Sequence, residues 1–479
     1  MVVAALVLVA LIGLGAVFGY RVVSFLRSVA NVGNPVDLIT HEIEPPVGSM
    51  AYKIKHGQRI NILALGYGGS ENDAPWLSDS IMAISIDTAN KRVVETSIPR
   101  DLYVTIDAWQ DGRAYKEKIN AAFEVPNEPR LFAPGALKPQ FQGKDGPGHL
   151  VEATVSRITG ITFDRYVAVD FKAFRDVVNA LGGIQVHMDG PLDDCHYPNG
   201  SHGYVNRGVP LGYRCPPGAG IHFAAGDYVV NGEQALQLAR SRDAIQPEQA
   251  NDFGRAKRQQ MIITAIKKKA VSANAITSAP QLMNALQNDF RTDMDLTDMK
   301  ALYDFGGKLP DTAIQHFAIT DQDLAQGYNP YTSGSCGPRP AYVLCPVDQT
   351  YRMWQSVFTR VPVVPQTLAE QAPVQLVNAS QNTIDLQTRT TLVLRQMGFT
   401  LADGVRHTPM TKSVVYDYSG GKYPQTAAWL RDFFGADVVQ ATPPSAGVRA
   451  SFVPAPGERT DGLVVVMGSD FARRWVGLG

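Results

Sequence analysis

Apolar and polar positions follow clear periods in the first half of the chain. Short apolar runs bounded by turn residues predict strands at 59–69, 80–87 and 92–98. Residues 148–188 then change period four times, which predicts a helix, a strand, a helix ending at two glycines, and a further strand. Strands that alternate with helices are typical of an α/β layer fold.

A similar pattern begins again at Pro373. It predicts strands at 374–380, 412–418 and 462–471, separated by helices at 386–399 and 425–436. We therefore expect a second, smaller α/β domain at 373–472. Residues 272–372 give weaker signals and are interpreted as an extension and linker, and residues 189–230, rich in Gly, Pro and Cys, as a loop.

The N-terminal segment has a different character. Val2–Tyr20 contains no charged residue, and about 20 such residues span a bilayer, so 2–20 is predicted to be a transmembrane helix. The alternative is a cleaved secretory signal, whose apolar region is shorter. Basic residues follow the span and none precedes it, which is the reverse of the usual pattern for an exported domain. We expect a further upstream segment to account for this, and residues 21–50 to form a linker.

Composition narrows the function. The 479 residues include 44 basic and 45 acidic side chains, with a formal net charge of -1. Binding to nucleic acid through bulk charge needs a strongly basic domain, and no helix-turn-helix with a basic recognition face is evident, so no nucleic-acid partner is expected. No glycine-rich phosphate loop with lysine occurs, which argues against nucleotide hydrolysis. Any basic site must therefore be local.

The chain has four cysteines: Cys195, Cys215, Cys336 and Cys345. In an exported protein, two local pairs predict disulfides 195–215 and 336–345. Cys195 and Cys215 could instead bind zinc together with His196 and His202, although the spacing lacks the usual CxxC pair.

A local basic cluster lies between Leu238 and Gln260. It contains four arginines: Arg240, Arg242, Arg255 and Arg258. Asn231 and Gln234 form a capping-box pattern, so a helix is expected to begin there and to carry Arg240 near its C-terminal end. Asp252 is positioned to cap a second helix.

The second helix places basic and apolar side chains on one face. Arg255, Gln259, Ile262 and Ile266 lie in a stripe about 60° wide, and Arg258 lies beside it. Arginines on the apolar side need an anion, because a buried unpaired charge is costly. The partner could be an internal carboxylate, with three acidic residues nearby: Asp243, Glu248 and Asp252. A phosphate ligand is the alternative, since guanidinium groups bind it bidentately.

Several motifs resemble the LytR-CpsA-Psr family. They occur in the family's order over about residues 57–270: "INILALG", "LSDSIMAISID", "KRVVETSIPRDLYV", "KINAAF", "ITGITFDRYVAVDFKAFRDVVNALGGIQV", "GEQALQLARSR" and "DFGRAKRQQ". Residues 373–471 resemble the domain often found at the C-terminus of that family. The resemblance places the first domain at 51–271.

The resemblance implies an α-β-α sandwich with an apolar tunnel for a lipid. It also implies a single-pass protein of the cell membrane, with its main domains outside the cytoplasm. Family members transfer a glycopolymer from a polyprenyl-pyrophosphate carrier to a hydroxyl of peptidoglycan or a similar envelope acceptor. A transcriptional regulator, a description often given to this family, is not expected here, because the predicted anchor and disulfides place the domain outside the cell.

The resemblance also assigns roles to residues. Six residues match pyrophosphate-binding positions: Arg100, Arg240, Arg242, Arg255, Arg258 and Gln259. Asp79 and Asp252 match acidic residues that hold Mg²⁺ (or Mn²⁺) or act in transfer, and catalysis is expected to involve Arg100 with these two aspartates. Magnesium prefers a few carboxylates together with phosphate oxygens, which suits two aspartates beside a pyrophosphate.

Two positions depart from the family pattern. Gly68 stands where the family commonly has an aspartate in "LGxD", and Leu77 stands where it commonly has an arginine in "RSD". Glu71 or Asp73, in the loop between them, could supply the missing carboxylate. The alternative is a weak or inactive member that binds polyprenyl pyrophosphate or the cell wall without transferring polymer.

Overall fold

The computed structural model describes most of the chain after residue 43. The described residues are 44–70, 73–113, 115–130, 132–195, 197, 220–241, 243–250, 252–270, 290–310, 313–328, 343–348, 350–363, 367–380, 385–441 and 461–475. No helix within these ranges is long and apolar enough to cross a bilayer. The span expected at 2–20 lies outside them, as does most of the expected linker.

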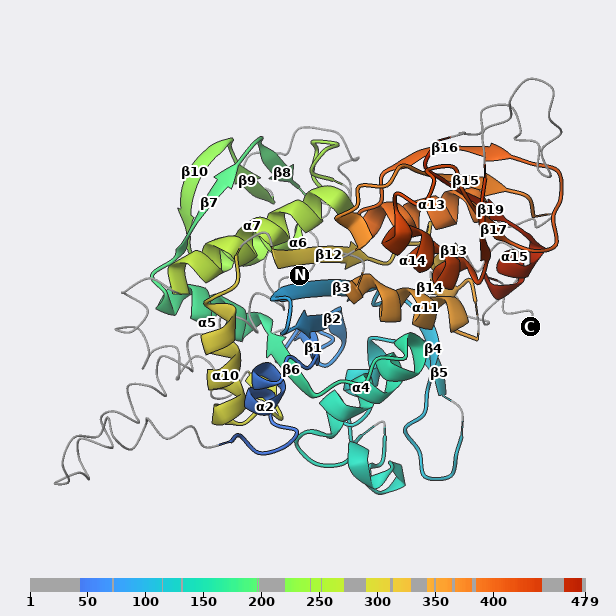
Figure 1. The fold of residues 1–479 in the computed structure, drawn as a ribbon. Coiled ribbons are helices and arrows are strands. Elements are labelled where there is room, and N and C mark those ends of the chain that lie inside the picture. The colour runs from blue at the N-terminus through green and yellow to red at the C-terminus, as the bar shows by residue number, and fades with distance from the viewer. Residues whose placement is uncertain are drawn as a thin grey trace, which may run out of the picture.

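A mixed six-stranded sheet forms the centre of the protein (Figure 1). Its strands, in spatial order, are β11 (Phe290–Thr292), β6 (Arg165–Asp170), β1 (Ile60–Tyr67), β2 (Ser78–Asp87), β3 (Arg92–Ile98) and β12 (Ile314–Ala318). β1 runs parallel to β6 and antiparallel to β2, and β3 runs antiparallel to β2 and parallel to β12. The four inner strands are those that the apolar runs predict.

The two edge strands come from the region interpreted as an extension. β11 pairs with β6, and β12 pairs with β3, so the sheet continues past the expected boundary at residue 271. Both strands are short, and each gains its hydrogen bonds from a partner far away in sequence. A local apolar pattern therefore gave little sign of them.

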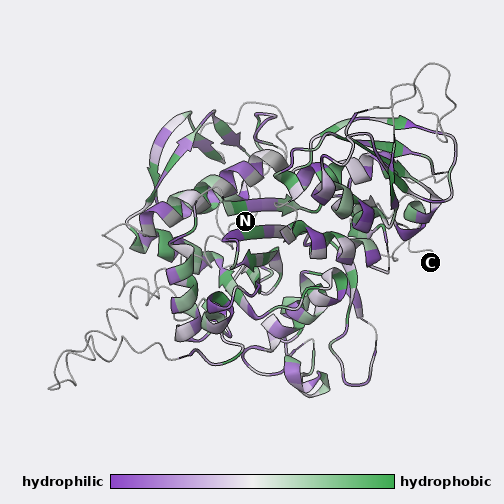
Figure 2. Ribbon diagram, in the orientation of Figure 1, coloured by the Kyte–Doolittle hydropathy of each residue, from purple (hydrophilic) through white to green (hydrophobic). Residues whose placement is uncertain are grey.

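Helices cover both faces of this sheet, which gives an α-β-α arrangement. One apolar cluster contains Leu63 and Leu65 of β1, and the other contains Ile62 and Ala64, because successive side chains point to opposite faces. The first face packs against α3 (Ala121–Glu124), α4 (Gly146–Thr159) and α11 (Arg352–Arg360). The second packs against α2 (Met50–Lys55), α5 (Phe171–Ala180), α6 (Gly232–Arg240), α7 (Asp252–Ala270) and α10 (Leu296–Gly306). These helices carry hydrophobic and hydrophilic residues side by side (Figure 2).

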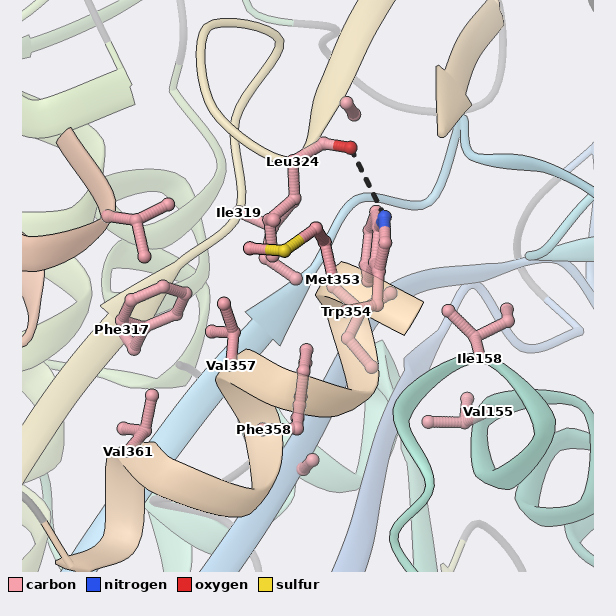
Figure 3. Packing of buried hydrophobic residues seen from close by; sticks show 14 of the residues in the cluster. Val155, Ile158, Phe317, Ile319, Leu324, Met353, Trp354, Val357, Phe358 and Val361 are labelled. Carbon is pink, nitrogen blue, oxygen red and sulfur yellow. Dashed lines mark hydrogen bonds between the residues drawn. The ribbon is translucent and has the colours of Figure 1, made fainter. Parts of the chain in front are cut away.

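Helix α11 packs tightly within the first apolar layer. Trp354 is fully buried, and its indole Nε1 donates a hydrogen bond to the carbonyl of Leu324 over 3.1 Å. Figure 3 shows α11 side chains beside Ile158 of α4 and Phe317 of β12. The polar atom of the tryptophan is thus satisfied while its ring fills the core.

Within the described part of the chain, four two-stranded ribbons lie outside the main sheet. They pair β4 (Tyr103–Ile106) with β5 (Tyr115–Lys118), β7 (Ile184–Met188) with β10 (Gly226–Val230), β8 (Leu192–Asp194) with β9 (Ile221–Phe223), and β13 (Ala325–Tyr328) with β14 (Val343–Pro346). The region 189–230, interpreted as a loop, therefore contributes three short strands. The 3-10 turns are η1 (Pro134–Ala136), η2 (Pro139–Phe141) and η4 (Val361–Val363).

The C-terminal residues form a second α/β unit. Its sheet has the order β16 (Leu401–Arg406), β15 (Val374–Asn378), β19 (Leu463–Met467), β17 (Val414–Asp417) and β18 (Asp437–Gln440). Its helices are α13 (Leu386–Gln396), α14 (Pro424–Phe434) and α15 (Ser469–Trp475). Apolar residues of this unit and of the central sheet belong to one continuous cluster. The predicted strands and helices are present, except that the strand expected at 462–471 ends at Met467 and Ser469 begins helix α15. The unit shares a core with the rest of the protein.

Glu370 lies in the segment before β15 and caps the N-terminal end of helix α14. Its carboxylate accepts hydrogen bonds from the backbone N–H groups of Gln425 and Thr426 at 3.0 and 2.8 Å. Burial alone would raise the pKa of Glu370, but the bonds from Thr426 and Gln425 outweigh it and lower that pKa below its ordinary value of 4.5. The carboxylate therefore stabilises the fold above pH 4.5, and this contribution is lost as the pH falls through the lowered pKa.

We expect Glu370→Gln to lower the free energy of unfolding by about 1 kcal/mol at neutral pH, because a charged helix cap is lost. The difference from wild type should shrink as the pH falls below the ordinary glutamate pKa of 4.5. Thermal unfolding at pH 7 and pH 4 checks this. Asp437→Asn, at an exposed position in β18, serves as the control, and an equal loss in that variant would contradict the capping role.

Candidate active site

Predicted site residues gather at one edge of the central sheet. The C-terminal ends of β1, β3 and β6 lie at this edge with the beginning of the antiparallel strand β2, as the register Tyr67↔Ser78, Tyr67↔Asp170 and Ile81↔Ile98 shows. The segments that continue from these strand ends are the loop after Tyr67, Arg100, and helix α5. Ligands of α/β proteins commonly bind at such strand ends.

Arg100 and Asp79 form part of a chain of alternating charges. The Nη1 of Arg100 is hydrogen-bonded to Oδ1 of Asp79, and its Nε lies 3.5 Å from Oδ2 of Asp101. The Nζ of Lys118 lies 2.5 Å from Oδ1 of Asp101. The order is therefore Lys118, Asp101, Arg100, Asp79, with no net charge. Asp101 thus pairs with both cations of this chain.

The "KINAAF" segment holds the two predicted site residues in place. The backbone N–H of Asn120 donates to the carbonyl of Arg100 over 3.3 Å. The carbonyl of Asn120 accepts from both the backbone N–H and the hydroxyl of Ser78, each at 3.2 Å. Asn120 is buried, so these bonds fix the backbone on either side of the Arg100–Asp79 pair.

Arg100 remains accessible despite its partners. Its side chain is 37% exposed, and that of Asp79 is 33% exposed. Burial alone would lower the pKa of Arg100, but the charges of Asp79 and Asp101 outweigh it and raise that pKa. The guanidinium is therefore permanently charged and open to solvent on one side, as an anion-binding group must be.

Arg240 differs from Arg100 in having aromatic neighbours. Its guanidinium lies 4.3 Å from the ring centre of Phe171 and 5.9 Å from that of Tyr197. It forms no ion pair with any carboxylate of the described residues. Burial raises the pKa of Tyr197 to about 12, although the charge of Arg240 opposes this, so the phenol stays neutral. A stacked arginine without an acidic partner is suited to bind an added anion.

Arg258 and Gln259 hold the end of helix α6. Arg258 donates to the carbonyls of Leu238, Ser241 and Gln249 at 2.9, 2.6 and 3.0 Å, and to the amide oxygen of Gln249 at 2.7 Å. Gln259 donates to the carbonyl of Ala239 over 3.0 Å. Four of the five guanidinium donors of Arg258 are thus used within the protein. In this structure the two residues support the end of the helix that carries Arg240, and the phosphate contact expected for them stays a prediction.

The prediction that Arg255 faces the interior of the protein is wrong, because Arg258 is the buried arginine of α7. Arg258, expected beside the stripe, is 3% exposed, whereas Arg255, expected within it, is only half-buried. Burial of Arg258 is tolerated because protein oxygens accept its N–H groups. Burial, with a smaller effect from the charge of Arg255, lowers the pKa of Arg258 to about 10. None of its hydrogen-bond acceptors is a carboxylate, so the expected internal acid pair is absent from its described contacts.

Other predicted residues are only partly placed. Arg242 and Glu71 lie outside the described residues, and of Asp252 only the backbone is described, as the first residue of α7. Asp73 is exposed in the loop after β1. The helix start predicted at Asn231 is confirmed, including both hydrogen bonds of the capping box. The roles expected for Arg242, Arg255 and Asp252 stay predictions.

The two departures from the family pattern have structural settings. Gly68 is buried, and the next residue, Gly69, has a φ of +75° and lies against Asp170, so an added Cβ would stand 2.6 Å from the Asp170 carboxylate. Asp170 in turn caps helix α5 through Ala173. Leu77 packs against the first apolar cluster. At these positions the chain uses a tight loop and an apolar contact in place of charged groups.

Sequence reasoning missed Arg291 and the aromatic groups at this edge. The guanidinium of Arg291 lies 4.7 Å from the ring centre of Trp76 and donates to Asn127 over 2.7 Å. Arg291 comes from β11, which gave no strand signal of its own. Phe171 carried a usable signal, since it directly follows the Asp170 cap at the end of a predicted strand.

The cysteines are partly described. Cys195 and Cys345 are each disulfide-bonded, and the part of the chain that the structure describes has no free thiol. A cysteine in a disulfide has no thiolate to offer zinc. The expected partners, Cys215 and Cys336, lie outside the described residues, so the pairing stays a prediction.

The donor set at this edge fits a magnesium ion in part. Mg²⁺ is usually bound by one or two carboxylates together with substrate phosphates and water. Asp79 supplies one partly exposed carboxylate, of which one oxygen is engaged by Arg100. Asp252 is the second expected ligand.

The chain is similar in sequence to proteins of known function. The chain is 30% identical over 252 residues to the Bacillus subtilis polyisoprenyl-teichoic acid–peptidoglycan teichoic acid transferase TagV, covering 53% of this chain and 54% of that protein. It is 26% identical over 285 residues to the Bacillus mycoides transferase TagU, covering 60% of this chain and 76% of the relative. The match thus spans about half the length of TagV.

Solved structures of similar proteins have a lower sequence identity to this chain. The crystal structure of B. subtilis TagV has a TM-score of 0.41 and 24% identity, covering 64% of this chain and 97% of that chain. Protein gbs0355 from Streptococcus agalactiae has a TM-score of 0.45 and 21% identity, covering 65% and 90%. The family model for LytR_cpsA_psr matches residues 32–335 and so includes the whole sheet edge that carries Arg100, Asp79 and Arg240. By that match over more than half of its length, the chain belongs to the LytR_cpsA_psr family.

Proposed function

We propose that this protein is a membrane-anchored phosphotransferase. It moves a glycopolymer from a polyprenyl-pyrophosphate carrier to peptidoglycan or a similar envelope acceptor. The domains described here would lie outside the cytoplasmic membrane, held by residues 2–20. Relatives named as polyisoprenyl-teichoic acid–peptidoglycan teichoic acid transferases support the class of reaction.

The observation that carries the proposal is the pair of arginines at one sheet edge. Arg100 extends from the end of β3 and contacts Asp79 of β2, while Arg240 stacks on Phe171 just past the end of β6. β6 and β2 are separated only by β1, which corresponds to a gap of about 10 Å. Two arginine side chains and one diphosphate can bridge such a gap. Arg240 lacks an acidic partner among the described residues, which leaves it available to the phosphate.

These residues suggest how the transfer proceeds. The acceptor hydroxyl oxygen forms a bond to the phosphorus nearer the glycan, and the bridging P–O bond breaks to release the lipid phosphate. Arg100 and Arg240 stabilise the negative charge that grows on the departing phosphate. The hydroxyl proton passes to an aspartate carboxylate at this edge. Mg²⁺, when bound by Asp79 and Asp252, would offset further charge on the diphosphate.

A second function is favoured by Gly68 and Leu77. Both replace charged groups that the family commonly has, and Leu77 is packed against the apolar core. The protein would then bind polyprenyl pyrophosphate or the cell wall without transferring polymer. The two functions differ in whether lipid phosphate is released.

The decisive experiment incubates the full chain, in detergent, with a polyprenyl-pyrophosphate-linked glycan and a peptidoglycan acceptor. We expect release of lipid phosphate with Mg²⁺ and none with EDTA. Asp79→Asn should reduce the rate by about 100-fold, because it removes a metal ligand and the anionic partner of Arg100. Asp111→Asn, at an exposed site in the β4–β5 connection, should leave the rate unchanged.

The other possible outcomes of this experiment would support the binding function or exclude particular groups from the reaction. Tight lipid binding without release would support the binding function. Release that is unaffected by EDTA and by Asp79→Asn would remove both the metal and Asp79 from the proposed reaction. Absence of both binding and release would mean that the arginines serve only internal contacts.

A further inference from the structure

A cluster of three metal-ligating side chains lies away from the candidate active site. His149 and Glu152 are one turn apart on α4, and Asp293 directly follows β11. One ligand atom from each lies within 4.8 Å of the others. The cluster adjoins Tyr166, near the start of β6, whereas the candidate active site is at the end of that strand, about 13 Å further along.

We propose that His149, Glu152 and Asp293 bind a divalent transition-metal ion of the Zn²⁺ class, at a site separate from the expected magnesium site. A tetrahedral zinc ion with bonds of about 2.0–2.2 Å places its ligand atoms about 3.3–3.6 Å apart. The Nε2 of His149 and Oδ2 of Asp293 are already 3.7 Å apart. One imidazole and two carboxylates suit Zn²⁺ better than Mg²⁺, which prefers oxygen ligands alone.

Outer contacts orient two of the three ligands. The Nδ1 of His149 is 3.4 Å from the carbonyl of Gln140, the kind of contact that directs the other ring nitrogen toward a metal. The Oδ1 of Asp293 accepts the backbone N–H of Tyr166 over 2.9 Å, which leaves Oδ2 facing His149. Both side chains thus present one ligand atom to the same point.

Glu152 supplies an independent sign that a cation belongs here. Its Oε1 is buried and has no hydrogen-bond partner among the residues that the structure describes. A buried carboxylate oxygen without a donor is costly, and the nearby carboxylate of Asp293 adds repulsion. Burial, followed by the charge of Asp293, raises the pKa of Glu152 to about 8. A bound cation would relieve both the missing contact and the repulsion.

The surrounding charged groups do not fill this role. Arg165 is committed to Asp298, with its Nε 2.7 Å from Oδ2, and to the carbonyl of Asp164. Asp164 pairs with Lys53.

The groups on the other side of the cluster also have partners. Asp145 accepts the hydroxyl of Tyr166 over 2.9 Å, and Arg291 faces Asn127 and Trp76. The described cations near the cluster therefore have other partners.

A metal at this point would join α4 to the edge strand β11. β11 carries Arg291, which contacts Trp76 in the loop after β1. We therefore assign the ion a structural role, one that stabilises an edge strand of only three residues.

Calorimetric titration of ZnCl₂ into the EDTA-treated full chain, with excess Mg²⁺ present, tests the proposal. We expect wild type to bind one equivalent through the cluster and its melting temperature to rise by a few degrees. Glu152→Gln should weaken binding at least about tenfold and His149→Ala about 100-fold. Asp79→Asn should leave zinc binding unchanged.

Matched variants keep the result interpretable. His187→Ala removes an exposed histidine that also lies beside two aspartates, so it reports on zinc bound at the surface. Glu152→Gln removes the metal-binding carboxylate without changing the size of the side chain, so the metal-free variant should be about as stable as wild type. Zinc binding that survives Glu152→Gln and His149→Ala, or that is lost in His187→Ala alone, overturns the proposal. Failure of wild type to bind zinc also overturns it.

Discussion

Replacement of Arg100 by alanine should lower the rate of lipid-phosphate release by about 100-fold or more, the loss usual when a donor to developing charge is removed. Arg100 is the partly exposed cation in the charge chain, and its guanidinium stays protonated beside Asp79 and Asp101. Without it, two carboxylates would face an incoming diphosphate, and within the charge chain Lys118 alone would remain to offset them. Both the loss of attraction and the new repulsion act against the transfer.

The measurement compares rates of release at saturating lipid for wild type and three variants. Arg100→Lys keeps the charge but loses the planar fork, so it should retain more activity than alanine and less than wild type. Arg113→Ala removes a more exposed arginine paired with Asp111 and should be neutral. If Arg100→Ala released lipid phosphate within about threefold of wild type, Arg100 could not be the group that stabilises the leaving phosphate.

Replacement of Arg258 by alanine should lower the free energy of unfolding by about 3 kcal/mol or more. Three backbone carbonyls and one amide oxygen would lose their donor, and Arg258 is almost fully buried, so water would not readily replace it. The cost of burying a guanidinium, visible in its lowered pKa, is recovered and offsets part of this loss. The lost hydrogen bonds and the cavity outweigh that gain.

Urea and thermal unfolding of the full chain measure this effect. Lys257→Ala, at the exposed neighbouring position, should change stability by no more than about 0.5 kcal/mol. Arg258→Met keeps most of the side-chain volume, so its stability should fall between that of Arg258→Ala and that of Lys257→Ala. The comparison separates the effect of the lost hydrogen bonds from that of the cavity. Equal stability of Arg258→Ala and wild type would show that the end of α6 does not depend on this side chain.

Elements with strong local signals were predictable from the sequence. The capping box at Asn231 and Gln234 fixed the start of α6, because both of its hydrogen bonds are made within four residues. The inner strands, α13 and α14 were predicted for the same reason, since their apolar periods are long enough to distinguish period 2 from 3.6. Helix α15 was not predicted, because its first residues were included in the expected strand at 462–471. The edge strands β11 and β12 were not, because their pairing depends on distant strands.

The sequence predicted which residues form the candidate site better than it predicted what those residues contact. The resemblance brought Arg100, Asp79 and Arg240 together. The strand register, with the contact of Arg240 to Phe171 just past the end of β6, places all three at one edge. Periodicity on α7 could not show that Arg258, and not Arg255, is the buried arginine. That difference depends on the carbonyls at the end of α6, which belong to another element.

The shared apolar core has a consequence for the C-terminal unit. Side chains of both sheets pack in one cluster, and Arg389 of α13 donates to the carbonyls of Asp323 and Ala325 at 2.7 and 2.8 Å. The unit therefore cannot swing on a tether. An envelope component bound to its surface would be held at a constant distance and angle from Arg100. The C-terminal unit could in this way set how far from the lipid carrier an acceptor is presented.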